Sequence, residues 1–78
     1  MAKKLYVGGL PYAATEQEVE EKFAQHGEVL SVSIMRDKFS GQSRGFGFVE
    51  MADDGQAQQA IDTLNGTDFN GRQLTVNE

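Results

Sequence analysis

In the eight-residue segment 44–51, the side chains at alternating positions form two sets, and only one of these sets can be buried. In a strand, successive side chains point to opposite faces. One face has Gly47, Val49 and Met51, and its glycine is expected to admit a closely packed helix. The other face has Phe46, Phe48 and Glu50. Because a carboxylate is costly to bury without a partner, the face that contains Glu50 is predicted to meet solvent and the other to enter the core.

The rest of the chain divides into five further segments of ordinary length. Lys4–Gly8 and Val32–Met35 alternate as strands do, and a loop over Asp37–Ser43 joins the second of these to residues 44–51. A last strand is expected after the Asn70-Gly71 turn, with Leu74 and Val76 facing inward and Gln73, Thr75 and Asn77 outward.

Two segments have the spacing of helices. Thr15 followed by Glu18 predicts a capping box, and the helix is expected to end at Gly27. Asp53 or Asp54 is predicted to cap the second helix, and Asn65-Gly66 to stop it. The apolar residues at helical spacing, with a core phenylalanine before the last strand, are Val19, Phe23, Ala57, Ala60, Ile61, Leu64 and Phe69.

The order strand, helix, strand, strand, helix, strand predicts an α+β fold of two layers. Right-handed crossover connections place both helices on one face of a four-stranded sheet, which is the ferredoxin-like arrangement βαββαβ. The opposite face of the sheet is then left uncovered.

Three aromatic rings are predicted on that uncovered face. Leu5 and Val7 belong to the core by their alternation, so Tyr6 points outward with Phe46 and Phe48. Flat rings stack on unpaired bases, at about 1 to 3 kcal/mol per base, whereas a duplex offers no splayed base. The rings therefore predict binding of short single-stranded RNA, with single-stranded DNA as a second ligand.

The length and composition of the chain exclude several other classes of protein. The 78 residues allow a single domain, 1–78, and the absence of cysteine excludes disulfides and thiolate chemistry. Neither a signal peptide nor an 18-residue apolar run is visible, so we expect a monomer in the cytoplasm, or in the nucleus if the source is eukaryotic, with no membrane partner.

The net charge of −5 is unusual for a nucleic-acid binder. The acidic residues, however, gather on the predicted helices, and of the seven basic residues only Lys22 lies in a helix. Local potential guides a ligand more than net charge does. Four phosphate contacts predict a slope of log K against log salt of about −3, or a shallower one.

The sequence resembles the RNA recognition motif family. Its Arg44-Gly45-Phe46-Gly47-Phe48-Val49-Glu50-Met51 matches the family's octamer, and Leu5-Tyr6-Val7-Gly8-Gly9-Leu10 its hexamer. The resemblance implies the strand order four-one-three-two, all antiparallel. The chain is also similar to small bacterial members of the family. It also implies that Tyr6 and Phe48 stack on successive bases, Phe46 packs on sugars and Arg44 contacts a phosphate.

Three positions depart from the family pattern. Met51 replaces an aromatic at the end of the octamer, and Gly9 stands where the hexamer often has asparagine. Lys22 stands where relatives often have leucine, which bears on helix packing alone. The first two lie off the stacking positions, so we expect binding to survive.

The predicted RNA-binding residues are Tyr6, Phe46, Phe48, Arg44, Lys4, Arg36, Lys38, Gln73 and Asn77. Phe39, in the loop, either clasps a base or folds back on the sheet edge, and Tyr12 is expected to pack its own loop.

No catalytic, metal or cofactor constellation is found, since the lone His26 has no partners and neither phosphate-binding glycine motif is present. The alternative is a protein-interaction module that uses the aromatic face or the acidic helical face. An enzyme on the same fold would need groups that the fold alone does not supply.

Overall fold

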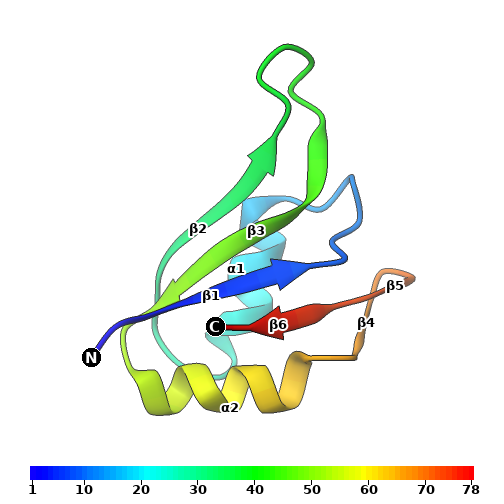
Figure 1. Cartoon of the computed structure of the whole chain (residues 1–78). Coiled ribbons are helices and arrows are strands. Elements are labelled where there is room, and N and C mark those ends of the chain that lie inside the picture. Colours follow the sequence, from blue (N-terminus) through cyan, green and yellow to red (C-terminus); the bar gives the residue numbers. More distant parts are fainter.

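The structure is a computed structural model that describes residues 1–78, the whole chain. Its elements follow one another as shown in Figure 1. They are β1 Lys3–Gly8, α1 Glu16–Ala24, β2 Val29–Arg36, β3 Ser43–Met51, α2 Asp54–Leu64, β4 Asp68–Phe69, β5 Arg72–Gln73 and β6 Thr75–Asn77.

Four strands form one antiparallel sheet in the order β2-β3-β1-β6. This is the predicted order, with the last strand beside the first, and the α+β ferredoxin-like prediction is confirmed. In Figure 1, α1 lies behind the sheet and α2 runs below it, while the loop between β2 and β3 projects well beyond the other elements.

The first helix begins as the sequence predicts. The Thr15 hydroxyl accepts a hydrogen bond from the Glu18 amide at 3.2 Å, and the Glu18 carboxylate accepts one from the Thr15 amide at 2.9 Å. This reciprocal pair satisfies two donors at the helix start. The helix ends at Ala24, before the predicted Gly27.

The second helix is fixed at both ends by side-chain oxygens. Asp53, one of the two predicted caps, accepts from the Gln56 amide at 2.8 Å. At the other end, Asn65 Oδ1 accepts a hydrogen bond from the Val76 amide at 2.9 Å, which ties the end of α2 to the edge strand β6. Gly66 then takes the left-handed φ of 83° predicted for the stop.

A single apolar core lies between the sheet and the helices. The predicted alternation is confirmed, because Val49 and Met51 are fully buried while Phe48 and Glu50 are only partly buried. The core residues are Leu5, Val7, Leu10, Ala14, Val19, Phe23, Ile34, Val49, Met51, Ala57, Ala60, Leu64, Phe69, Leu74 and Val76.

The C-terminal segment is less regular than predicted. The last strand of the main sheet is only Thr75–Asn77, and the Asn70-Gly71 turn joins β4 to β5 in a separate two-stranded ladder. Both turn residues have positive φ, as a tight hairpin turn requires. Gln73 therefore belongs to this small ladder, and the prediction that it extends the last strand was wrong.

Gly47 is needed for a different reason from the one expected. We expected a glycine on the inward face to admit a helix. A Cβ at Gly47 would instead collide with the backbone carbonyl oxygen of Ser33 in β2. Close approach of two neighbouring strands, next to an irregular register after Ile34, thus requires the glycine.

Candidate nucleic-acid interface

Three aromatic rings meet on the outer face of β1 and β3. Tyr6 stands opposite Phe48 in the register of the two strands, and Gly8 opposite Phe46. The ring centroids are 6.0 Å apart for Tyr6 and Phe46, 6.2 Å for Tyr6 and Phe48, and 6.4 Å for the two phenylalanines. We call Tyr6, Phe46 and Phe48 the ring platform; each ring is half-buried by its neighbours.

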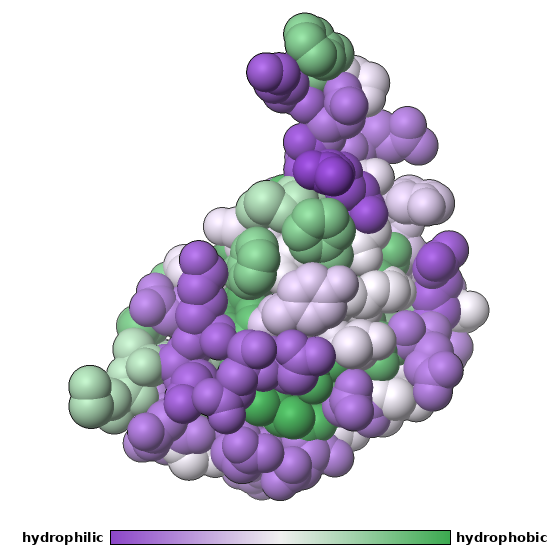
Figure 2. Space-filling view, in the orientation of Figure 1, coloured by the Kyte–Doolittle hydropathy of each residue, from purple (hydrophilic) through white to green (hydrophobic).

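The ring platform lies at the centre of the uncovered face. Figure 2 shows apolar and weakly polar surface gathered over the middle of the sheet, with hydrophilic groups around it. No helix covers this face (Figure 1). The partly exposed rings contact one another in stacked and edge-on arrangements, which aromatic pairs favour.

Two cations lie against the rings. The Lys4 ammonium is 4.8 Å from the centroid of Phe48, and the Arg44 guanidinium carbon is 5.5 Å from that of Phe46. At these distances a cation is attracted to the ring face. Positive charge therefore stands at both ends of the ring platform, where the phosphates of a stacked strand would need it.

Polar side chains continue the same face onto the neighbouring strands. Asn77 of β6 is paired with Tyr6, and Thr75 with Gly8. Both side chains are exposed, as the alternation predicted. On the other side, Ser33 of β2 is opposite Phe48 and Ser31 opposite Glu50. The sequence reasoning did not select Glu50, Ser31 or Ser33 as site residues, although Glu50 shares the parity of Phe48.

Arg36 forms an ion pair on the helical side of the molecule. Its guanidinium donates to the Glu16 carboxylate at 3.0 Å. Hydrogen bonding from its own backbone amide, and next from Arg36, holds the pKa of Glu16 below its usual value. The sequence already indicated this orientation, because Arg36 lies two residues after the inward-facing Ile34 and so shares its face of β2.

Gln73 also has a hydrogen-bond partner away from the ring platform. Its side-chain amide donates to the Gly66 carbonyl at 3.1 Å, next to the end of α2. Two of the nine predicted contact residues, Arg36 and Gln73, thus have partners within the protein, whereas the others border the platform or the projecting hairpin.

The β2–β3 loop is held by one carboxylate. Asp37 accepts from the amides of Phe39 and Ser40, each at 2.9 Å, and these two bonds, the one from Ser40 first, lower the pKa of Asp37. Phe39 is 89% exposed, with the Lys38 ammonium 5.4 Å from its ring. Of the two readings left open, folding back on the sheet edge is therefore excluded for Phe39.

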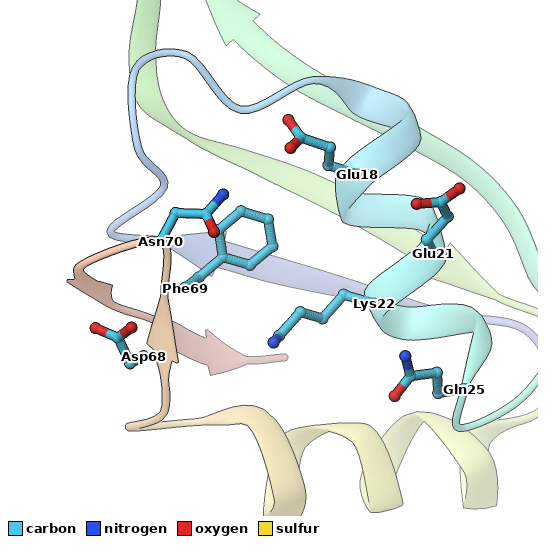
Figure 3. Close-up of a pocket in the computed structure, with 7 residues that line it drawn as sticks. All are labelled: Glu18, Glu21, Lys22, Gln25, Asp68, Phe69 and Asn70. Atoms are coloured by element: carbon cyan, nitrogen blue, oxygen red, sulfur yellow. The ribbon is translucent and has the colours of Figure 1, made fainter.

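A hollow of about 450 Å³ lies on the opposite side, between α1 and the β4–β5 hairpin. Figure 3 shows carboxylates from both elements around it, with Lys22 extended toward Phe69, whose ring is 5.3 Å from the ammonium. Phe69 itself is buried, as predicted. This hollow is polar and does not adjoin the ring platform.

Two kinds of feature are absent from the chain. No His, Cys, Asp or Glu side chains gather in a group that could hold a metal ion. Neither of the two helices has the length and apolar character needed to traverse a bilayer. Tyr12, 56% exposed, packs beside the Arg72 guanidinium at 5.5 Å and borders Gly45.

The chain belongs to the RNA recognition motif family, whose sequence profile matches residues 5–75. That family is one of RNA-binding domains rather than of enzymes. The match runs from within β1 to the start of β6 and contains both motifs of the ring platform, so the fold and the family agree.

Relatives of the chain include bacterial and plant proteins. RbpD of Nostoc sp. is 47% identical over 74 residues, which are 95% of this chain and 79% of that protein. The glycine-rich RNA-binding protein blt801 of Hordeum vulgare is 44% identical over 75 residues, 96% of this chain but 47% of its own length. The chain thus spans about half the length of such plant relatives.

Solved structures give the same result. The crystal structure of RNA binding protein PG1 superposes with a TM-score of 0.94 at 43% identity, covering 96% of this chain and 90% of that one. The second domain of yeast poly(U)-binding protein Pub1 superposes with a TM-score of 0.87 at 36% identity, covering 95% and 89%.

Proposed function

We propose that this domain binds short single-stranded RNA by stacking bases on the ring platform. The observation that carries the proposal is the contact of three rings from two strands on an uncovered sheet face, with centroids 6.0 to 6.4 Å apart. Stacking is worth about 1 to 3 kcal/mol per base. The names of the relatives, several of which are RNA-binding proteins, support the same ligand.

The proposed contacts follow from the side chains around the rings. Bases stack on Tyr6 and Phe48, a sugar packs on Phe46, and Arg44 meets a phosphate. Lys4, Lys38 and Asn77 complete the set, each exposed beside the ring platform or on the projecting hairpin. Single-stranded DNA is expected to stack in the same way, because stacking involves the faces of the bases rather than the 2′-hydroxyl.

Residues 1–78 are proposed to act as one such domain, as a monomer in the cytoplasm. A post-transcriptional role, in which the domain binds or remodels transcripts, is consistent with contacts that are mostly sequence-tolerant. The charge distribution supports RNA as the ligand of the sheet face, since Lys4 and Arg44 stand there while the α1 carboxylates lie on the helical side.

The test is a fluorescence anisotropy titration with a labelled single-stranded RNA of eight nucleotides. Phe48→Ala is expected to weaken binding at least fivefold, because one base loses its stacking partner. Leu30→Ala is the matched control, since it removes another exposed apolar side chain of the same sheet. Equal affinities of the wild type and Phe48→Ala would refute the stacking proposal.

The alternative, a protein-interaction module, predicts a different pattern. A partner docked on the acidic hollow between α1 and the β4–β5 hairpin would be released by Glu21→Lys and unaffected by Phe48→Ala. The cations against the rings favour RNA, because they have no role in docking an apolar peptide on the same face.

A further inference from the structure

A row of three polar side chains crosses the sheet immediately beside the ring platform. Glu50 of β3 is paired with Lys4 of β1 on one side and with Ser31 of β2 on the other. The next row contains Phe48, with Tyr6 and Ser33 as its neighbours. The three side chains therefore start from the row of the sheet next to Phe48.

None of these three side chains takes part in an ion pair or a side-chain hydrogen bond within the protein. The two ion pairs of the structure join Lys3 to Glu78 and Arg36 to Glu16, so Lys4 and Glu50 are both unpaired although they face each other across two strands. The Lys4 ammonium leans over Phe48 instead, at 4.8 Å from its centroid. Glu50 keeps both carboxylate oxygens available on a partly exposed surface.

A carboxylate on a face that binds RNA can contact only a few groups of the ligand. It repels phosphates, and it accepts hydrogen bonds only, so it can be satisfied by N–H groups on base edges or by a sugar hydroxyl. Glu50 lies two residues from Phe48 on the same face, about 7 Å along the strand. That distance puts the carboxylate beside the edge, and not beneath the plane, of a base stacked on Phe48.

The four bases differ in what they offer to such a group. Guanine alone has two adjacent N–H donors on its Watson–Crick edge, N1–H and the 2-amino group, which match the two oxygens of one carboxylate. Its neighbouring O6 is an acceptor suited to an ammonium. Cytosine and adenine offer one amino group beside an acceptor nitrogen, and uracil offers one imino group between two carbonyls. In each of these bases an acceptor atom next to the donor repels the second carboxylate oxygen.

We propose that Glu50, with Lys4, reads the base stacked on Phe48 and selects guanine. Glu50 accepts from N1–H and the 2-amino group, and Lys4 swings from the ring face to donate to O6. Ser31 borders the carboxylate from β2 and keeps that side of the row polar. This inference rests on the proposed function, and it adds a specificity to a platform whose stacking is otherwise sequence-tolerant.

The test compares uridine octamers that carry one central guanosine, inosine, adenosine or cytidine, titrated at fixed salt against the all-uridine octamer. Wild type is expected to bind the guanosine octamer on the order of tenfold more tightly than the other standard octamers. Inosine, which lacks the 2-amino group, is expected to fall between guanosine and adenosine.

Glu50→Gln is expected to abolish the preference while the all-uridine octamer binds as well as or better than before, because a negative charge has left the RNA face. Glu21→Gln on α1 removes the same charge from the helical side and is expected to keep the preference. Thermal unfolding of both variants verifies that the fold is retained.

The outcomes separate the two proposals. Equal affinity of wild type for all four standard octamers, or a guanosine preference that persists in Glu50→Gln, overturns the guanine assignment. If in that case Phe48→Ala still weakens binding of every octamer, the stacking proposal stands. If no octamer binds to wild type at all, both proposals fall together.

Discussion

Tyr6 and Phe48 are directly opposite each other in neighbouring antiparallel strands, with centroids 6.2 Å apart and planes inclined at 70°. Each ring is held on edge against the other before any ligand arrives. The pair therefore contributes to the stability of the free domain as well as to the surface that we propose for RNA.

A double-mutant cycle measures this mutual support. Tyr6→Ala and Phe48→Ala are expected to be non-additive in the free energy of unfolding by urea, with a coupling of about 0.5 to 1.5 kcal/mol, because the ring contact is lost only once. Tyr6→Ala combined with Phe39→Ala is the control and should be additive, since Phe39 is at the projecting loop. Additivity of the first pair would mean that the rings do not support each other.

The salt dependence of RNA binding should be shallower than the seven basic residues suggest. Lys3 and Arg36 are paired with carboxylates at 2.9 and 3.0 Å, Lys22 lies in α1, and Arg72 lies beside Tyr12. Lys4, Lys38 and Arg44 remain near the proposed path of the strand. On an all-uridine RNA, which offers Lys4 no guanine O6, three phosphate contacts predict a slope of log K against log salt of about −2. A slope of −4 or steeper, measured between about 50 and 200 mM salt, would contradict this set of contacts.

The two arginines flanking the β2–β3 loop should behave differently. Arg44→Gln is expected to weaken RNA binding by about 1.5 kcal/mol or more, as expected for loss of a charge-assisted hydrogen bond. Arg36→Gln should change affinity less than twofold (~0.4 kcal/mol), because Arg36 is engaged with Glu16 on the helical side. The same titration, with circular dichroism as the check on folding, compares them, and equal losses would show that Arg36 also reaches the ligand.

The parity of β2 and β3 can be tested by placing a charge on each face. Met51 is fully buried, so Met51→Asp introduces an unpaired charge into the core and is expected to unfold a domain of this size. Met35→Asp is the control on the partly exposed side of β2 and should cost about 1 kcal/mol or less. Far-UV circular dichroism and urea unfolding distinguish the two, and a folded Met51→Asp would contradict the assigned face.

The pH dependence of the β2–β3 loop follows from Asp37. Its pKa is lowered by amide hydrogen bonds from Ser40 and Phe39, so the loop is stabilised at every pH above the usual aspartate value of about 3.9 and loses that stabilisation as the pH falls through the lowered pKa. The amide chemical shifts of Phe39 and Ser40 should titrate with a midpoint below 3.9. A midpoint at or above that value would mean that the two hydrogen bonds are absent in solution.

Local rules predicted most of the fold. The identity of Glu50 was enough to orient β3, because only one of the two faces could be buried with it, and the orientation of Tyr6 followed from its own alternation. The capping box of Thr15 and Glu18 was equally readable, since both partners lie within one turn. Family resemblance supplied the strand order, which alternation alone does not determine.

Features that depend on distant residues were missed. The ion pair of Arg36 with Glu16 joins residues 20 apart in sequence, and only the folded chain brings them together. The break at Leu74, which separates β5 from β6, depends on the pairing of Gln73 with Asp68 rather than on any local pattern. The proposed contacts accordingly leave out Arg36 and Gln73, which have partners within the protein. The proposed guanine contact adds Glu50, whose charge had been used only to orient the strand.

The hydrogen bond from the Val76 amide to Asn65 has a consequence for the molecule in a crowded solution. β6 is a three-residue strand at the border of the sheet, and an unpaired amide there is a template on which a strand of another molecule can add. Asn65 occupies that amide with an oxygen of the same chain, at 2.9 Å. Asn65, which ends α2, is therefore also expected to hinder self-association through strand addition at the β6 edge of the sheet.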